Sequence, residues 1–108
     1  MELTVRVICR PALSGAFLVA GVSVDEAADA VACAEVLKRR AADPKLGVLL
    51  IEASLHRALP EELLKRIDRQ ALPIVVPFPD PSWDGRALAE EYVLEILRQA
   101  IGYRVRPQ

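Results

Sequence analysis

The sequence predicts an α/β fold, a three-layer sandwich with a four-stranded parallel sheet, followed by a C-terminal helix. Three observations support this prediction. Segments with the pattern of strands alternate with segments with the pattern of helices along the 108 residues. Two strand segments, 46–51 and 72–77, are apolar without alternation, which is typical of strands buried on both faces of a parallel sheet. Hydrophobic residues make up 53% of the chain, which supplies one core and argues against intrinsic disorder.

The first strand and the first helix are expected within the opening 20 residues or so. Residues 3–9 alternate at first and then become apolar, as a strand entering a core does. Pro11 favours a helix start, so a short helix is predicted over 11–20, with apolar side chains from Leu13, Phe17 and Leu18. Gly21 is placed where such a helix ends.

A second strand and a long second helix follow. Val22 to Val24 form a short strand candidate, and Asp25 is expected to cap a helix that runs to about Ala42, with Glu26 and Asp29 in its first turn. Its predicted apolar face consists of Ala27, Ala30, Val31, Ala34 and Leu37. The basic run 38–40 suits the negative end of the helix dipole, and a binding patch is the alternative.

The third strand, 46–51, ends at Glu52 and leads into a loop through His56. The carboxylate of Glu52 is expected to cap the amides of the following turn, which includes Ser54, with a partner contact as the alternative. Pro60 and two acidic residues then start a helix that ends near Gln70. The proline-bounded segment 72–77 is the fourth strand.

The last helix is the most informative element for function. It is predicted over residues 86–101, after a proline-rich loop and before Gly102. A helix that covers one side of a sheet needs a single apolar stripe, whereas this one is apolar on two sides. Either all of that surface packs on the sheet, or the helix is shared with another chain, in the manner of a groove-bound or coiled-coil helix.

Charge and composition argue against several functions. With 14 basic and 15 acidic residues, the net charge of −1 lacks the basic excess of a nucleic-acid binder. Cys9 and Cys33 lie in apolar contexts without metal-ligand spacing, so buried reduced thiols are expected. No apolar run approaches the roughly 20 residues of a transmembrane helix, and no signal peptide is evident. We therefore expect a cytoplasmic protein without direct membrane insertion.

Catalytic and phosphate-binding motifs are not evident, so no catalytic, cofactor-binding or metal-binding residue is predicted. His56 is the single histidine, and no nucleophile or acid is placed near it by a known motif. The five glycines are scattered and form no phosphate-binding loop. A phosphorelay receiver needs an acidic pair after its first strand, where this chain has Arg10, which would repel the metal ion.

Four segments, in this order, carry a family resemblance: 15–22 (GAFLVAGV), 49–52 (LLIE), 73–79 (PIVVPFP) and 100–103 (AIGY). They resemble segments of the F subunit of the V/A-type ATPases, the rotary proton- or sodium-translocating ATP synthases of archaea, some bacteria and eukaryotic vacuoles. The resemblance covers nearly the whole chain. Arg10 departs from it, since family members commonly carry an acid directly after the first strand.

The resemblance implies a non-catalytic component of the central stalk, or rotor, without a cofactor and peripheral to the membrane. It implies a Rossmann-like, receiver-like α/β domain over 1–78, a proline-rich loop or hinge over 79–85, and a C-terminal helix and tail over 86–108. That helix would lie along the coiled coil of the D subunit, within a complex that couples ATP hydrolysis or synthesis to proton or sodium transport. The predicted partner interface comprises Leu88, Tyr92, Val93, Ile96, Leu97, Ala100, Ile101 and Tyr103.

A free-standing α/β module that regulates or binds a small ligand is the alternative function. Ligands of parallel α/β sheets bind outside the carboxyl ends of the strands. Glu52, His56 and the loop after Val76 would then line the site.

Overall fold

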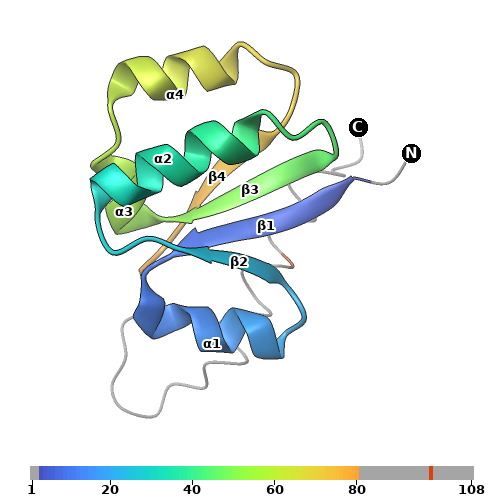
Figure 1. The fold of residues 1–108 in the computed structure, drawn as a ribbon, viewed down its shortest axis with the longest axis vertical. Helices are drawn as coiled ribbons and strands as arrows, with labels where there is room; N and C mark the ends of the chain where they lie inside the picture. The colour runs from blue at the N-terminus through green and yellow to red at the C-terminus, as the bar shows by residue number, and fades with distance from the viewer. Residues whose placement is uncertain (1–2, 81–97, 99–108) are drawn as a thin grey trace.

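The structure, a computed structural model, describes residues 3–80 and residue 98. A parallel sheet occupies the centre and helices cover both of its faces, which confirms the predicted α/β fold (Figure 1). Apart from residue 98, the fourth expected helix, the tail and most of the predicted hinge lie outside the described residues.

The sheet has four strands in the order β2-β1-β3-β4, and all neighbouring pairs are parallel. β3 is an inner strand, and each of its seven residues is buried, as its unbroken apolar run predicts. The strand bounds are Thr4–Cys9 for β1, Ser23–Glu26 for β2, Leu46–Glu52 for β3 and Ile74–Phe78 for β4.

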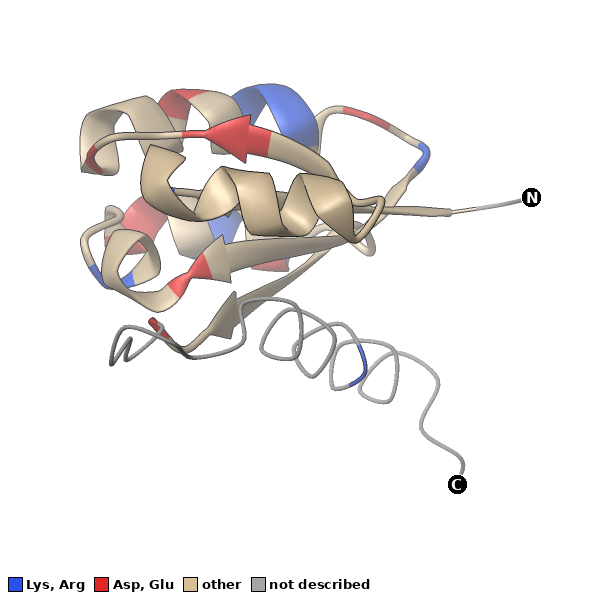
Figure 2. Ribbon diagram, turned by 90° about the horizontal axis from the view of Figure 1, so that it is seen from below, with Lys and Arg blue, Asp and Glu red and all other residues tan. Residues whose placement is uncertain are grey.

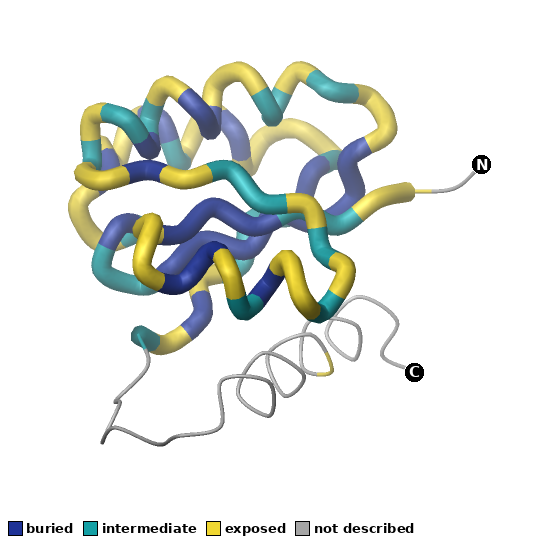
Figure 3. The backbone as a smooth tube through the Cα atoms, turned by 60° about the horizontal axis from the view of Figure 1, so that its bottom comes forward, coloured by how far each residue is buried: buried dark blue, intermediate teal, exposed yellow. Residues whose placement is uncertain are grey.

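Helix α1 (Pro11–Val19) covers one face of the sheet, and α2 (Ala30–Ala41), α3 (Ala53–Arg57) and α4 (Glu61–Asp68) cover the other (Figure 1). The alternation of side chains along each strand divides the core into two clusters. Val7, Leu50 and Phe78 face α1, where the rings of Phe17 and Phe78 meet edge to face at 5.4 Å. Ile8, Leu49 and Ile51 face the other helices. Figure 3 shows these buried strands between the partly exposed helices.

The predicted start of the second helix is wrong. β2 extends through Asp25 and Glu26, which pair with Ile8 and Cys9 of β1. The helix begins at Ala30 instead, where the Asp29 carboxylate accepts a hydrogen bond from the Ala32 amide at 2.9 Å.

This shift also changes the buried face of α2. Val31, predicted to be apolar core, is 76% exposed, whereas the buried residues of the helix are Cys33, Val36 and Leu37. Ala27 is buried as predicted, although it lies in the connection before the helix.

Three smaller corrections concern α1, the chain around His56, and Phe78. Leu18 is 59% exposed and does not belong to the core. The expected loop through His56 is the short helix α3. Phe78 ends β4 as a core residue, so the strand continues one residue past Pro77. Gly21 follows α1 with a φ of +85°, a conformation that favours glycine, as the sequence predicts.

Both cysteines are free and buried, as expected. Within the described part of the chain, no helix is long and apolar enough to cross a membrane.

Candidate functional site

The predicted partner interface lies in the C-terminal segment, beyond residue 80. All eight of its residues, Leu88, Tyr92, Val93, Ile96, Leu97, Ala100, Ile101 and Tyr103, lie outside the described residues. The interface therefore stays a prediction. What the structure describes is the domain that precedes this segment and the carboxyl edge of the sheet, where the alternative function places its site.

The carboxyl edge is organised by an ion pair between Arg10 and Glu52. The Glu52 side chain is fully buried and accepts three hydrogen bonds from Arg10: from the backbone amide at 2.9 Å, from Nε at 3.1 Å and from Nη2 at 2.5 Å. The side-chain hydrogen bonds, together with the charge of Glu52, raise the pKa of Arg10 above its ordinary value. The pair joins the ends of β1 and β3, two neighbouring strands of the sheet.

This geometry corrects the predicted role of Glu52. Its carboxylate does not cap α3, because no amide of that helix donates a hydrogen bond to it. The Ser54 amide donates instead to Oδ1 of Asp80, at 3.1 Å. Arg57 of α3 lies 3.8 Å from the other oxygen of Asp80. Asp80 thus fastens the chain after β4 to α3, at the start of the predicted hinge.

Acidic residues occupy the carboxyl ends of β2 and β3 (Figure 2). Glu26 of β2 accepts a hydrogen bond from the Ser14 hydroxyl of α1 at 2.6 Å. Burial, followed by the charges of Glu52 and Glu26, raises the pKa of the Cys9 thiol to about 12. Cys9 is therefore a protonated core thiol at neutral pH and not an activated nucleophile.

His56 is half-buried on α3, and burial lowers its pKa, an effect that the charge of Asp68 partly opposes. The imidazole is therefore neutral at pH 7. Its ring forms no hydrogen bond with another of the described residues. Residues 3–80 also contain no group of three or more side chains able to hold a metal ion. Of the two residues named for a ligand site, Glu52 is hydrogen-bonded to Arg10, and no hydrogen bond joins it to His56.

A second ion-pair cluster joins β1, β2 and the end of α2. Asp25 accepts hydrogen bonds from Arg6 Nε at 2.7 Å and from Arg40 Nε and Nη2 at 2.7 and 2.9 Å. Burial acts to raise the pKa of Asp25, but the hydrogen bonds and charges of the two arginines outweigh it and lower the pKa to about 2. One member of the basic run 38–40 therefore has a structural role inside the domain.

The chain matches a known protein family over most of its length. The family model described as the ATP synthase (F/14-kDa) subunit matches residues 5–96. The chain belongs to this family. The match confirms the resemblance drawn from the sequence segments, and it continues past β4 to include the positions of Leu88, Tyr92, Val93 and Ile96.

A solved structure supports the same fold. The F subunit of the V-type ATP synthase from Archaeoglobus fulgidus superposes with a TM-score of 0.64 at 20% sequence identity, over 72% of this chain and 99% of that one. At this identity the likeness shows the α/β fold alone. No curated protein matches the chain.

Two features of the edge are not evident from local sequence. Arg10 stands out in the sequence as a departure from the family, but its partner Glu52 is 42 positions away and no local pattern joins them. Asp80 has the sequence context of an ordinary loop residue between prolines. A parallel sheet brings the carboxyl ends of all its strands to one edge. Charged residues at or just after the strand ends are therefore the sequence signal that could have placed Arg10, Glu52 and Asp80 at the same edge.

Proposed function

We propose that this chain is a non-catalytic component of the central stalk of a V/A-type rotary ATPase. Its C-terminal segment, 86–108, binds the coiled coil of the D subunit, and the assembled shaft helps to couple ATP hydrolysis or synthesis to proton or sodium transport. The domain over 1–78 and the hinge over 79–85 carry this segment. The family match over residues 5–96 is the observation that supports the proposal most strongly.

Two further observations agree with it. The sequence over 86–101 is apolar on more sides than one packing partner requires. Asp80 holds the chain against α3 through the Ser54 amide, so the chain is held at the edge of the domain at residue 80. A shaft component needs such a fixed point, because a segment bound to a partner transmits force only if its base is held.

Co-expression with the A, B and D subunits of the same organism tests the proposal. The tagged wild-type chain is expected to co-purify with the D subunit. The variant Ile96→Asp/Ala100→Asp places two carboxylates on the predicted interface and is expected to lower the recovery of the D subunit by about tenfold or more, because buried unpaired charges are costly. Val31→Asp is the matched control, since Val31 is an apolar residue that is 76% exposed on α2.

Each outcome has a defined meaning. Loss in the double variant with retention in Val31→Asp supports the interface. Full recovery of the D subunit by the double variant contradicts the interface, and failure of the wild-type chain to recover any of the three other subunits contradicts the stalk assignment. The ligand-binding alternative has less support, because Glu52 is already hydrogen-bonded to Arg10.

A further inference from the structure

A groove runs between α2 and α4 on the outer surface of the domain. Its volume is about 320 Å³. Its apolar surface comes from Ala34 of α2 together with Pro60 and Leu63 at α4. Its charged lining is predominantly basic and consists of Lys38, Arg66, Arg69 and one acid, Glu62.

The basic side chains of this groove are available to a partner. Within residues 3–80, neither Arg66 nor Arg69 forms a salt bridge or a side-chain hydrogen bond, whereas Arg6, Arg10 and Arg40 are all paired. Lys38 makes one loose contact, at 3.9 Å to Glu35 on its own helix. The groove therefore holds two unpaired guanidinium groups and a weakly paired ammonium group around apolar side chains.

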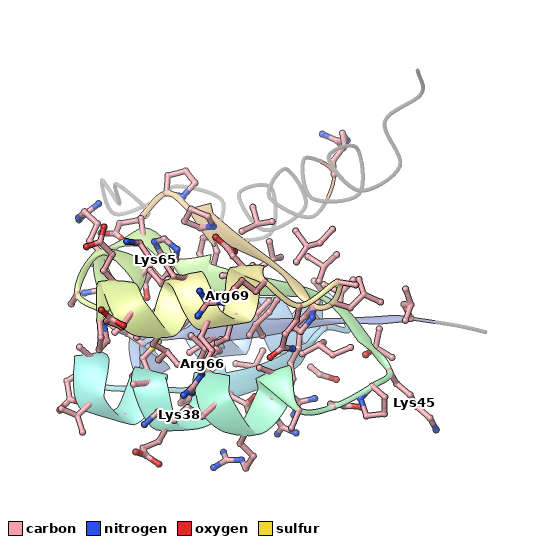
Figure 4. All side chains as sticks on the ribbon, turned by 90° about the horizontal axis from the view of Figure 1, so that it is seen from above. Lys38, Lys45, Lys65, Arg66 and Arg69 are labelled. Atoms are coloured by element: carbon pink, nitrogen blue, oxygen red, sulfur yellow. The ribbon has the colours of Figure 1, made fainter. Side chains whose placement is uncertain are left out.

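The positions of the basic side chains on α2 and α4 also matter. Figure 4 shows Arg66 in the space between the two helices and Lys38 on α2, whereas Lys65 lies on the side of α4 away from α2. The dipole of α4 favours a cation in its last turn, and Lys65 meets that preference from the outer side. Arg66 in the last turn of α4 and Lys38 in the last turn of α2 meet the same preference, and both line the groove.

We propose that the groove between α2 and α4 docks an acidic helix of a partner polypeptide. Two packed helices present the ridges and grooves that accept a third helix. The half-buried Ala34 and the exposed Pro60 offer apolar surface to that helix above the buried Leu63, and Lys38 on one wall with Arg66 and Arg69 on the other fits carboxylates along both edges of its apolar stripe. Glu62 lies nearer the start of α4 and opposes a carboxylate there, which gives the partner helix a direction.

This surface is distinct from the C-terminal segment of the proposed function and does not depend on it. The occupant is a polypeptide rather than a small anion, because the cations are spread over two helices and an apolar surface separates them. Because the chain belongs to a family of ATP synthase subunits, other polypeptide subunits are expected as its partners.

Titration of the full 108-residue chain with a synthetic helix tests the inference. The probe is a capped peptide of about 18 residues, long enough for five turns, with glutamates on both edges of a leucine–alanine stripe. Binding is followed by amide chemical shifts at about 0.15 M salt, and a peptide with glutamine at each glutamate is the control ligand. The expected shifts centre on Ala34, Lys38, Leu63 and Arg66.

Charge reversal supplies the decisive comparison. Arg66→Glu/Arg69→Glu is expected to weaken binding by about tenfold or more, whereas Lys65→Glu, a reversal on the same helix but outside the groove, changes it by less than about twofold. Three results would overturn the inference: no saturable binding of the acidic peptide, equal weakening by Lys65→Glu, or tighter binding of inorganic pyrophosphate than of the peptide at the same residues. The last result would identify a small-anion site instead.

Discussion

The fully buried Glu52 carboxylate accepts three hydrogen bonds from Arg10, two from the guanidinium and one from the backbone amide. Replacing Arg10 with methionine removes the two guanidinium bonds and leaves the one from the backbone amide. A charge-assisted hydrogen bond contributes roughly 1.5–3 kcal/mol, and two are lost. The Arg10 side chain is 48% exposed, so solvent screens the pair and lowers this sum. We expect Arg10→Met to reduce the free energy of unfolding by about 2–4 kcal/mol at pH 7.

Urea denaturation of the 108-residue chain, followed by circular dichroism, measures this loss. Arg57→Met is the matched control, because Arg57 is 71% exposed and lies 3.8 Å from its partner Asp80. The control is expected to cost less than about 1 kcal/mol. The double variant Arg10→Met/Glu52→Met removes both charges and is expected to be more stable than Arg10→Met, because an unpaired buried charge costs more than a buried apolar pair.

Two results would contradict the predicted importance of the Arg10–Glu52 pair. If Arg10→Met and Arg57→Met lower the free energy of unfolding by the same amount within about 0.5 kcal/mol, the buried pair of Arg10 with Glu52 is no more stabilising than the exposed pair of Arg57 with Asp80. If the double variant is less stable than Arg10→Met by the full cost of Glu52→Met, the two residues are not coupled.

Three further predictions concern other parts of the domain. Because the folded-state pKa of Asp25 is about 2 and its ordinary value is 3.8, its ionisation contributes up to about 2 kcal/mol above about pH 4, lost as the pH falls toward 2. Urea denaturation against pH is expected to show this loss in the wild type and not in Asp25→Asn; parallel curves would contradict it. Burial raises the pKa of Cys9 to about 12 and that of Cys33 to about 11, so both thiols should react slowly with a disulfide reagent at about pH 8 until urea unfolds the chain. Fast labelling of the native chain would refute the burial of the thiols. Gly21→Ala should cost about 1 kcal/mol because φ there is +85°, whereas Gly15→Ala, inside α1 with open space at the added methyl, should stabilise the chain by a few tenths to about 1 kcal/mol. Equal thermal midpoints for these two variants would show that backbone conformation is not the cause.

Much of the fold follows from local sequence signals. The unbroken apolar run of β3 and the glycine after α1 carry their information within a few residues, and the structure confirms both; the proline-bounded segment 72–77 is confirmed as a strand, although Pro77 lies inside β4. The start of α2 does not follow from local sequence signals. Asp25 and Asp29 are both good capping residues, and the choice between them depends on whether the chain at 25–26 pairs with β1, which is a long-range contact.

The edge of the sheet is predictable to a smaller degree for the same reason. Sequence reasoning places Glu52 correctly at the carboxyl end of a buried strand, but the neighbouring amides offer a plausible local partner and Arg10 offers a stronger distant one. A carboxylate in a fully buried position needs a cation, and a local cap provides only dipoles. The burial of Glu52, which no local pattern reveals, is thus what decides its partner.

The position of these contacts bears on how the domain serves a family of ATP synthase subunits. The carboxyl edge is the usual ligand site of a parallel α/β sheet, yet here its central acid is held by Arg10, and Asp80 is held by the Ser54 amide and Arg57. Both contacts join separate elements: the first ties β1 to β3, and the second ties the chain after β4 to α3. An edge used in this way fixes the point from which the chain leaves the domain, which is the property that the proposed stalk function requires of it.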